Sequence, residues 1–196
     1  MTRIELKNQA KKDIEGKLGA FLVILLIILG VSLLTSSLAG GAGSLITILI
    51  AGPLALAEAK IVVDLVRKGK SPKPADLLYG FKEDTIIPAL LAYVRQFVFT
   101  FLWSLLFWIP GIIKGISYSQ MFYLMADDPK LSAKDAQAKS MAMMEGHKWD
   151  YFVLTLSFIP WALLVGITFG IASVYVYPYM EATFANFYKD LAAKNK

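Results

Sequence analysis

The chain has 196 residues, the length of one domain or at most two, and it contains no cysteine. Disulfides, thiolate metal sites and cysteine nucleophiles are therefore excluded, and the single histidine, His147, leaves almost no basis for a histidine metal site. Hydrophobic residues make up 57% of the chain and charged residues only 18%, and the mean hydropathy is +0.57. This composition is more apolar than that of a soluble domain and indicates an integral membrane protein. The net charge is +5, and its meaning depends on where the charges lie.

The apolar segments, taken in chain order, predict about six membrane helices. The first carries no charge and is long enough to cross a hydrocarbon core of roughly 30 Å. Two later stretches are too long for one span each. We expect Pro110-Gly111 to be a hairpin tip that divides the first of them, and Gly166 and Gly170 to mark the break in the second. The predicted spans are 19–38, 44–66, 86–109, 112–126, 150–168 and 171–190.

The basic residues predict how the chain is oriented in the membrane. Under the six-helix prediction, 17 of the 20 lysines and arginines fall on one side, in the N-terminal segment, in the segments after the second and fourth helices, and in the tail. Because lysine and arginine gather on the cytoplasmic side, we expect both termini in the cytoplasm. The basic excess then faces anionic lipid headgroups and gives no support for nucleic-acid binding. Residues 3–39 also have the pattern of a secretory signal, but the apolar segments that follow favour an uncleaved first helix.

A polar segment that ends near a glycine and a lysine precedes each predicted hairpin. Gly16, Gly80 and Gly146 are 64 and 66 residues apart, which predicts repeats at 1–66, 67–126 and 127–196 within a single membrane domain of residues 1–196. The segments ELKNQAKKDIEGK, PADLLYGFK and SAKDAQAKSMAMMEGHK have the pattern of amphipathic helices on a membrane surface. The alternative is that they are ordinary polar loops that end in glycine. The predicted fold class is all-α and polytopic, with three hairpins, cytoplasmic amphipathic helices and a pseudo-threefold repeat.

The second arm of each hairpin carries one polar residue in similar surroundings. These are Glu58 in LAEAK, Gln120 in YSQMF and Glu181 in YMEAT, at spacings of 62 and 61 residues. If the hairpins pack about a pseudo-threefold axis, the three side chains converge. Arg95 lies mid-helix, where an arginine costs about 2.5–3.5 kcal/mol on insertion scales, so we expect Glu58 or Glu181 as its partner. These four residues predict an intramembrane polar site, and a structural ion pair or a snorkelling arginine is the alternative.

Lys114 is the one basic residue predicted near the opposite membrane face. It predicts a contact with an anionic lipid headgroup, with simple interfacial snorkelling as the alternative. Lys60 and Asp64 lie near a helix end and are expected to snorkel as well. Asp127-Asp128-Pro129 is expected to end the fourth helix and to cap the segment that follows.

Motifs for enzyme chemistry are missing from the sequence. There is no HExxH and no Walker loop, and GISYS lacks the final glycine of Gly-x-Ser-x-Gly. The predicted spans contain neither a Ser/His pair nor paired aspartates for intramembrane hydrolysis. We therefore predict no catalytic residues, no metal site and no cofactor.

The C-terminal half carries a family resemblance. The run WIPGIIKGISYSQMFYLMADDP, followed by DAQAKSMAMMEGHKWDYFVLTLSFIPWALL and YPYMEATFANFYKDL, resembles the bacterial integral-membrane family catalogued as domain of unknown function 975. The resemblance covers nearly the whole chain, most specifically residues 100–190. It implies a bacterial cytoplasmic-membrane protein without assigned catalytic residues, and the family looks related to the membrane domains of some glycerophosphodiester phosphodiesterases. Pro160 stands where the family pattern has a glycine, so we expect the fifth helix to be kinked differently.

Two functional hypotheses from different classes follow. The first is a non-enzymatic membrane module that organises lipids or partner proteins through its cytoplasmic helices and basic loops, which explains the charge pattern and the missing enzyme motifs. The second is a small transporter, channel or lipid-translocating protein, with Glu58, Arg95, Gln120 and Glu181 as its site. Membrane lipids are the expected partners, and protein partners or a homo-oligomer stay open.

Overall fold

The computed structural model describes residues 1–37, 41–106 and 108–194, and the regular elements in these ranges are all helices. The predicted all-α class is therefore confirmed. The elements are α1 (Arg3–Ile14), α2 (Leu18–Ser37), α3 (Gly41–Lys68), the 3-10 helix η1 (Pro74–Phe81), α4 (Ile86–Leu106), α5 (Trp108–Tyr118), α6 (Met121–Asp127), α7 (Ala133–Met143), α8 (Lys148–Leu156), α9 (Ile159–Ile167) and α10 (Ser173–Lys194).

Four helical segments of the described chain are long and apolar enough to cross a membrane. They are Leu18–Ser37, Ile46–Lys68, Ile86–Leu105 and Lys148–Ile167, and they match the first, second, third and fifth predicted spans. The other two predicted spans, 112–126 and 171–190, stay predictions. The first of these is divided into α5 and α6, and neither piece alone reaches across roughly 30 Å of hydrocarbon at about 1.5 Å per residue. The second corresponds to α10, which is largely packed inside the protein.

The Pro110-Gly111 pair is not the hairpin tip that we expected. Both residues lie inside α5, close to its start, where a proline is tolerated because the backbone N–H groups of a first turn have no helical partner. Gly111 also lets α5 approach α4 closely, since a Cβ at this position would lie 2.1 Å from Oγ of Ser104. Residue 107, next to the expected tip, and residues 38–40, at the expected first turn, lie outside the described residues.

The fifth predicted span is interrupted before Pro160. Helix α8 ends at Leu156 and α9 begins at Ile159, so Pro160 occupies the first turn of a new helix. A proline cannot continue a helix from the preceding turn, which accounts for this break. The expected difference from the family pattern stays a prediction. The next break falls between Ile167 and Ser173, near the glycines where the sequence predicted it.

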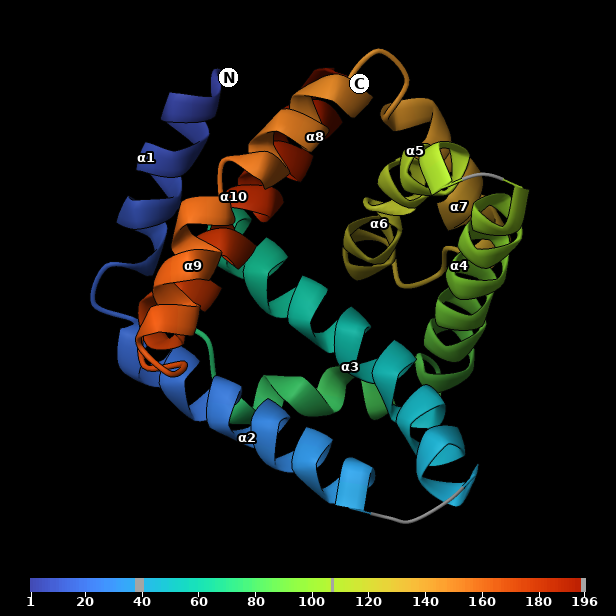
Figure 1. Cartoon of the computed structure of the whole chain (residues 1–196), viewed down its shortest axis with the longest axis horizontal. Coiled ribbons are helices and arrows are strands. Elements are labelled where there is room, and N and C mark those ends of the chain that lie inside the picture. The colour runs from blue at the N-terminus through green and yellow to red at the C-terminus, as the bar shows by residue number, and fades with distance from the viewer. Residues whose placement is uncertain (38–40, 107, 195–196) are drawn as a thin grey trace.

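Helix α3 runs through the middle of the molecule (Figure 1), and each of the three polar helices packs on one main neighbour. Helix α1 packs on α10, η1 packs on α3, and α7 packs on α6. Each polar helix therefore contacts the second arm of the predicted hairpin that comes before it in the chain. Helix α1, which comes before the first hairpin, contacts the second arm of the last one. The apolar stripe of α1, formed by Leu6, Ala10 and Ile14, is at most 2% exposed and lies in the core. The repeat and the hairpin arrangement stay predictions, and this cyclic packing is the feature that agrees with them.

Helices α3, α6 and α10 are fastened together at one end by polar contacts. Arg67 forms a salt bridge of 2.6 Å with Asp127, the hydroxyl of Tyr188 donates a hydrogen bond to the same carboxylate, and Arg67 lies over the Tyr188 ring at 5.4 Å. Helix α6 ends at Asp127, as expected, but the N-cap of α7 is Ser132. Asp127 is committed to α3 and α10, whereas Asp128 Oδ1 accepts a hydrogen bond of 3.1 Å from the backbone N–H of Lys130. An acid therefore caps the turn that follows α6, although it does not cap α7 itself.

Candidate functional site

Two of the four predicted intramembrane residues come together in the interior. Tyr177 in α10 donates a hydrogen bond of 3.0 Å from its hydroxyl to Glu58 Oε1 in α3. Glu58 and Glu181 are close enough to interact electrostatically. Glu181 lies one helical turn after Tyr177, so both side chains project from the same face of α10.

Two more tyrosines complete this group. Tyr123 in α6 interacts electrostatically with both carboxyl groups, and Tyr151 in α8 interacts with Glu181. We call Glu58, Tyr123, Tyr151, Tyr177 and Glu181 the carboxylate–tyrosine cluster. It joins α3, α6, α8 and α10, and it contains acceptor and hydroxyl groups but no cationic side chain.

Gln120, the third predicted residue, lies at the edge of this cluster. The hydroxyl of Ser119 is hydrogen-bonded to Tyr151 and also accepts a hydrogen bond of 2.7 Å from the Gln120 side-chain amide. Gln120 is fully buried, and its Oε1 has no hydrogen-bond partner within the described part of the chain. The backbone N–H of Gln120 is held by Ser140 of α7 at 3.2 Å. Glu58 is thus hydrogen-bonded to Tyr177, and Gln120 is joined through Ser119 to Tyr151.

Arg95 does not pair with an acid of the cluster, so the expected ion pair is wrong. Its guanidinium donates a hydrogen bond to Gln137 of α7 and lies 5.0 Å from the centre of the Phe99 ring. Gln137 is only 4% exposed. The arginine is therefore satisfied by a buried amide of a neighbouring helix, which the sequence could not reveal because Gln137 lies in a segment that we read as a surface helix.

Lys114 lies over an aromatic ring. Its Nζ is 4.8 Å from the centre of the Trp103 ring, which places a cation–π contact between α5 and α4. This contact neither requires nor excludes a lipid headgroup, so the predicted headgroup contact of Lys114 stays a prediction.

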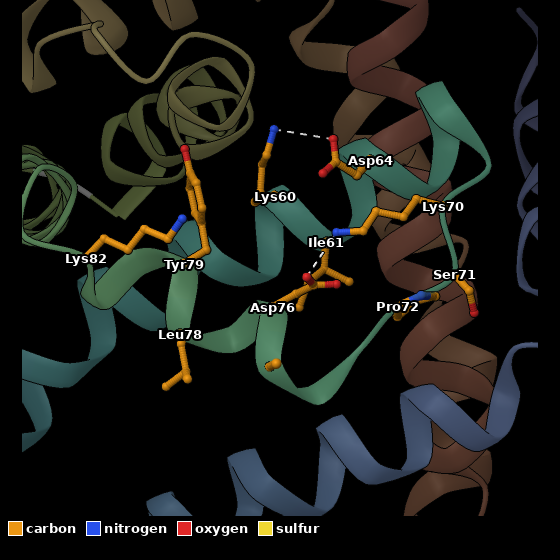
Figure 2. Close-up of a pocket in the computed structure, with 11 residues that line it drawn as sticks. Lys60, Ile61, Asp64, Lys70, Ser71, Pro72, Asp76, Leu78, Tyr79 and Lys82 are labelled. Atoms are coloured by element: carbon orange, nitrogen blue, oxygen red, sulfur yellow. Dashed lines mark hydrogen bonds and ion pairs between the residues drawn. The ribbon is translucent and has the colours of Figure 1, made fainter.

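A second site, which the sequence did not single out, lies where α3 ends against η1. A cavity of about 220 Å³ is lined there by Lys60, Ile61, Asp64, Lys70, Ser71, Pro72, Ala75, Asp76, Leu78, Tyr79 and Lys82. Figure 2 shows that the side chains of Lys60 and Tyr79 point the same way from their two helices, with the Lys82 amine beside the tyrosine ring. The amines of Lys60 and Lys82 lie 5.7 Å and 5.3 Å from the centre of that ring. We call this the lysine–tyrosine pocket.

The charges of this pocket are only partly balanced. Lys70 pairs with Asp76 at 3.0 Å, and Lys60 lies 3.3 Å from Asp64, which a second lysine also contacts. Within the described ranges, Lys82 has no carboxylate within 4.0 Å, and it is exposed. Lys60 and Asp64 are thus engaged with neighbouring groups, and Lys60 also donates a hydrogen bond of 3.1 Å to the Ala126 carbonyl.

Tyr79 gives the pocket an unused donor. Its hydroxyl oxygen is buried and has no hydrogen-bond partner among the residues that the structure covers. Burial, together with the carboxylates of Asp84 and Asp64, raises the pKa of Tyr79 above its ordinary value, so the hydroxyl keeps its proton. A buried hydroxyl without a partner costs free energy, and an acceptor that enters the pocket removes this cost.

The sequence signals for these residues were present but were not used. The tyrosines of the cluster were not singled out, although Tyr177 precedes Glu181 by four residues and Tyr123 follows Gln120 by three residues. No group of three or more histidine, cysteine, aspartate or glutamate residues with the placement of a metal site is found among the described residues.

The comparisons with known proteins agree with the resemblance seen in the sequence. The family model described as "Protein of unknown function (DUF975)" matches residues 1–115 and 105–195, which together span nearly the whole chain. No curated protein and no solved structure matches the chain.

Proposed function

Since the chain belongs to this family of unknown function, we propose its role from its own geometry: it is a non-enzymatic integral membrane protein that binds anionic lipid headgroups in the lysine–tyrosine pocket. The apolar helices support the assignment to a membrane. The observation that carries the headgroup proposal is the buried, unpartnered hydroxyl of Tyr79, whose ring centre lies 5.7 Å and 5.3 Å from the amines of Lys60 and Lys82.

The donors of the pocket suit a phosphate group. A lipid phosphate offers several acceptor oxygens and a negative charge, and lysine and a protonated tyrosine hydroxyl are both hydrogen-bond donors. Lys82 is exposed and has no carboxylate partner among the described residues, while Tyr79 supplies a buried hydroxyl donor. Lys70 and Lys60 already have carboxylate neighbours, so they contribute positive potential more than direct contacts.

The place of the pocket supports a headgroup over a free solute. It lies beside the last turns of α3, at the end of a candidate span, where headgroups are expected. The predicted orientation places this end, the basic segments and both termini on the cytoplasmic side of a bacterial inner membrane, where anionic lipids attract polybasic segments. The proposed role is to organise lipids or partner proteins. The polar helices α1, η1 and α7 form the surfaces that contact them.

Comparative lipid binding tests this proposal. The full chain is purified in detergent, and its thermal midpoint is measured with added phosphatidylglycerol and with added phosphatidylcholine. We expect phosphatidylglycerol to stabilise the wild type more. The substitutions Lys82→Gln and Tyr79→Phe each remove one donor to a charged group, worth about 1.5–3 kcal/mol, so each weakens binding of phosphatidylglycerol roughly tenfold or more.

The control for this test is Lys130→Gln, which removes the same charge from an exposed lysine outside the pocket. It should keep the preference of the wild type for phosphatidylglycerol. Equal stabilisation by the two lipids, or an equal loss in all three variants, would show that the pocket does not select a headgroup.

The transport hypothesis is favoured by a separate observation. Glu58 accepts a hydrogen bond from Tyr177, one helical turn before Glu181, and neither carboxyl group forms an ion pair with a lysine or arginine among the described residues, which static packing does not explain. Flux of a solute in liposomes that contain the purified protein, compared with protein-free liposomes, is the measurement that separates transport from a purely binding role.

A further inference from the structure

We propose that a cavity between α3, α4 and α6 binds an uncharged lipid that carries a free hydroxyl group, such as a diacylglycerol, through Gln96 and Thr100. The cavity has a volume of about 420 Å³, and its lining includes Ala55 from α3, Phe122 from α6, and Gln96, Phe97, Thr100 and Phe101 from α4. We call it the mid-span cavity. It shares no lining residue with the lysine–tyrosine pocket, so this inference goes beyond headgroup binding.

The two candidate spans that line this cavity place it deep in the membrane. Ala55 comes nine residues after the start of the span Ile46–Lys68, and Gln96 comes ten residues after the start of Ile86–Leu105. At about 1.5 Å per residue, both positions lie roughly 14–15 Å into a hydrocarbon core of roughly 30 Å, which is near its middle. Lipid tails offer no hydrogen bonds at this depth, so a polar side chain there needs a partner from the protein or from a ligand.

Two polar atoms in the wall of the mid-span cavity have no such partner. The side-chain oxygen of Gln96 and the hydroxyl of Thr100 are buried, and neither is hydrogen-bonded within the described part of the chain. The hydroxyl of Ser104, which also lines the cavity, donates its hydrogen bond of 2.8 Å to the Thr100 carbonyl instead. Unpaired buried groups cost free energy, and a ligand that pairs with them removes this cost.

A single ligand hydroxyl can satisfy both atoms. Gln96 and Thr100 are four residues apart in α4, so their side chains project from one face of the helix. A hydroxyl between them can donate to Gln96 Oε1 and accept from the Thr100 hydroxyl. Both atoms are recessed, but the last torsion of a glutamine is broad and a threonine in a helix has two χ1 rotamers, so small rotations turn them toward the cavity.

The charges around the cavity favour an uncharged ligand. None of the described residues that line it is charged. Arg95, the neighbour of Gln96 in the chain, is hydrogen-bonded to Gln137 of α7. An ionised headgroup would therefore lose its hydration here without gaining a counter-charge, whereas the desolvation of an alcohol costs far less. An uncharged lipid alcohol thus fits this cavity better than a phosphate-bearing lipid does.

The rim of the cavity suits the acyl chains of such a lipid. The rings of Phe97 and Phe101 are stacked with their centroids 6.1 Å apart, and the two residues are 62% and 54% exposed although both line the cavity. In a membrane these rings contact lipid tails, so the cavity is continuous with the surrounding hydrocarbon. The acyl chains of a ligand can then stay in apolar surroundings while its hydroxyl reaches Gln96.

Native mass spectrometry tests the site with a matched pair of lipids. The detergent-purified full chain is incubated with 1,2-dioleoylglycerol or with its 3-O-methyl ether, which has the same chains but no O–H donor. We expect one dioleoylglycerol per chain, bound roughly 3–10-fold more tightly than the ether, because one hydrogen bond distinguishes them. Gln96→Leu removes the acceptor and should bind the two lipids equally. Thr100→Val should weaken binding of both lipids, whereas Thr100→Ser keeps the hydroxyl and should bind as the wild type does.

Two control variants separate this site from the rest of the protein. Ser32→Ala removes an exposed hydroxyl from another span, α2, and should keep the preference for dioleoylglycerol. Lys82→Gln, in the lysine–tyrosine pocket, should keep it as well, so the test does not depend on the headgroup proposal. The two lipids are compared within each variant, so a change in basal stability does not affect the result.

Three results would overturn the proposal. One is equal binding of the two lipids by the wild type, or binding of neither. A second is a preference for dioleoylglycerol that Gln96→Leu retains. The third is a dimer without bound lipid that Gln96→Leu converts to a monomer, which would assign the mid-span cavity to a second copy of the chain.

Discussion

Helix η1 packs so closely on α3 that there is no room for a side chain at Gly80. A Cβ atom there would lie 1.8 Å from the carbonyl oxygen of Pro53 and 2.6 Å from its carbonyl carbon. Ordinary van der Waals contact begins at 3.4 Å, and a backbone carbonyl cannot rotate away as a side chain can. The substitution Gly80→Ala therefore forces η1 away from α3, and Tyr79 moves with it.

The expected cost follows from this overlap. Overpacking of a well-packed contact costs typically about 1–3 kcal/mol. For a chain of this length, each kcal/mol shifts the thermal midpoint by about 2–4 °C, so Gly80→Ala should lower the midpoint by about 2–12 °C. The lysine–tyrosine pocket should suffer as well, because Lys60 is on α3 and Tyr79 is on η1.

The assay is thermal unfolding of the purified chain in one detergent, with and without phosphatidylglycerol. Gly166→Ala is the matched control, because a methyl group there meets no described heavy atom within 4 Å and the residue is exposed in α9. Alanine is favoured over glycine in a helix by up to about 1 kcal/mol, so this control should unfold at or slightly above the wild-type midpoint.

If Gly80→Ala unfolds at the wild-type midpoint, the reasoning is refuted, because η1 then does not pack on α3 as closely as it does in the structure. A lower midpoint with unchanged stabilisation by phosphatidylglycerol would keep the packing argument and would separate it from the headgroup proposal.

Two further predictions concern single polar contacts. In a double-mutant cycle of Arg95→Met and Gln137→Met, we expect a coupling of about 1–2 kcal/mol in unfolding free energy, whereas a coupling of Arg95 to Glu58 instead would contradict the observed partner. Burial, with the charges of Arg3 and Lys11, lowers the pKa of Lys7. The unfolded chain then holds this proton to higher pH than the folded chain. The free energy of unfolding should therefore rise with pH between the lowered pKa and the ordinary value of 10.5. The variant Lys7→Gln should not show this rise. A difference in unfolding free energy between the wild type and Lys7→Gln that stays constant over the alkaline range would contradict this prediction.

The sequence alone determined the helical class and the existence of apolar segments. These follow from local properties: a run of about 20 apolar residues needs an internally hydrogen-bonded backbone to enter lipid, and a helix provides it. The glycine-rich break before α10 was also readable, because glycine permits a positive φ such as that of Gly170. The position of Pro160 in a first turn follows because its missing N–H acts within one turn. Pro110 was misread because the same chemistry permits a proline in a first turn as well as between helices.

The tertiary structure decided which polar groups meet. The sequence marked Glu58 and Glu181 by their spacing, but it assigned them to Arg95. Only the packing of α3 on α10 shows that Tyr177 binds Glu58, while Gln137 binds the arginine. The lysine–tyrosine pocket was hidden for the same reason, since its walls come from two helices joined by a close glycine contact. Periodicity states which face of a helix is apolar, whereas the partner of a polar side chain depends on contacts between residues far apart in the chain, which no local pattern encodes.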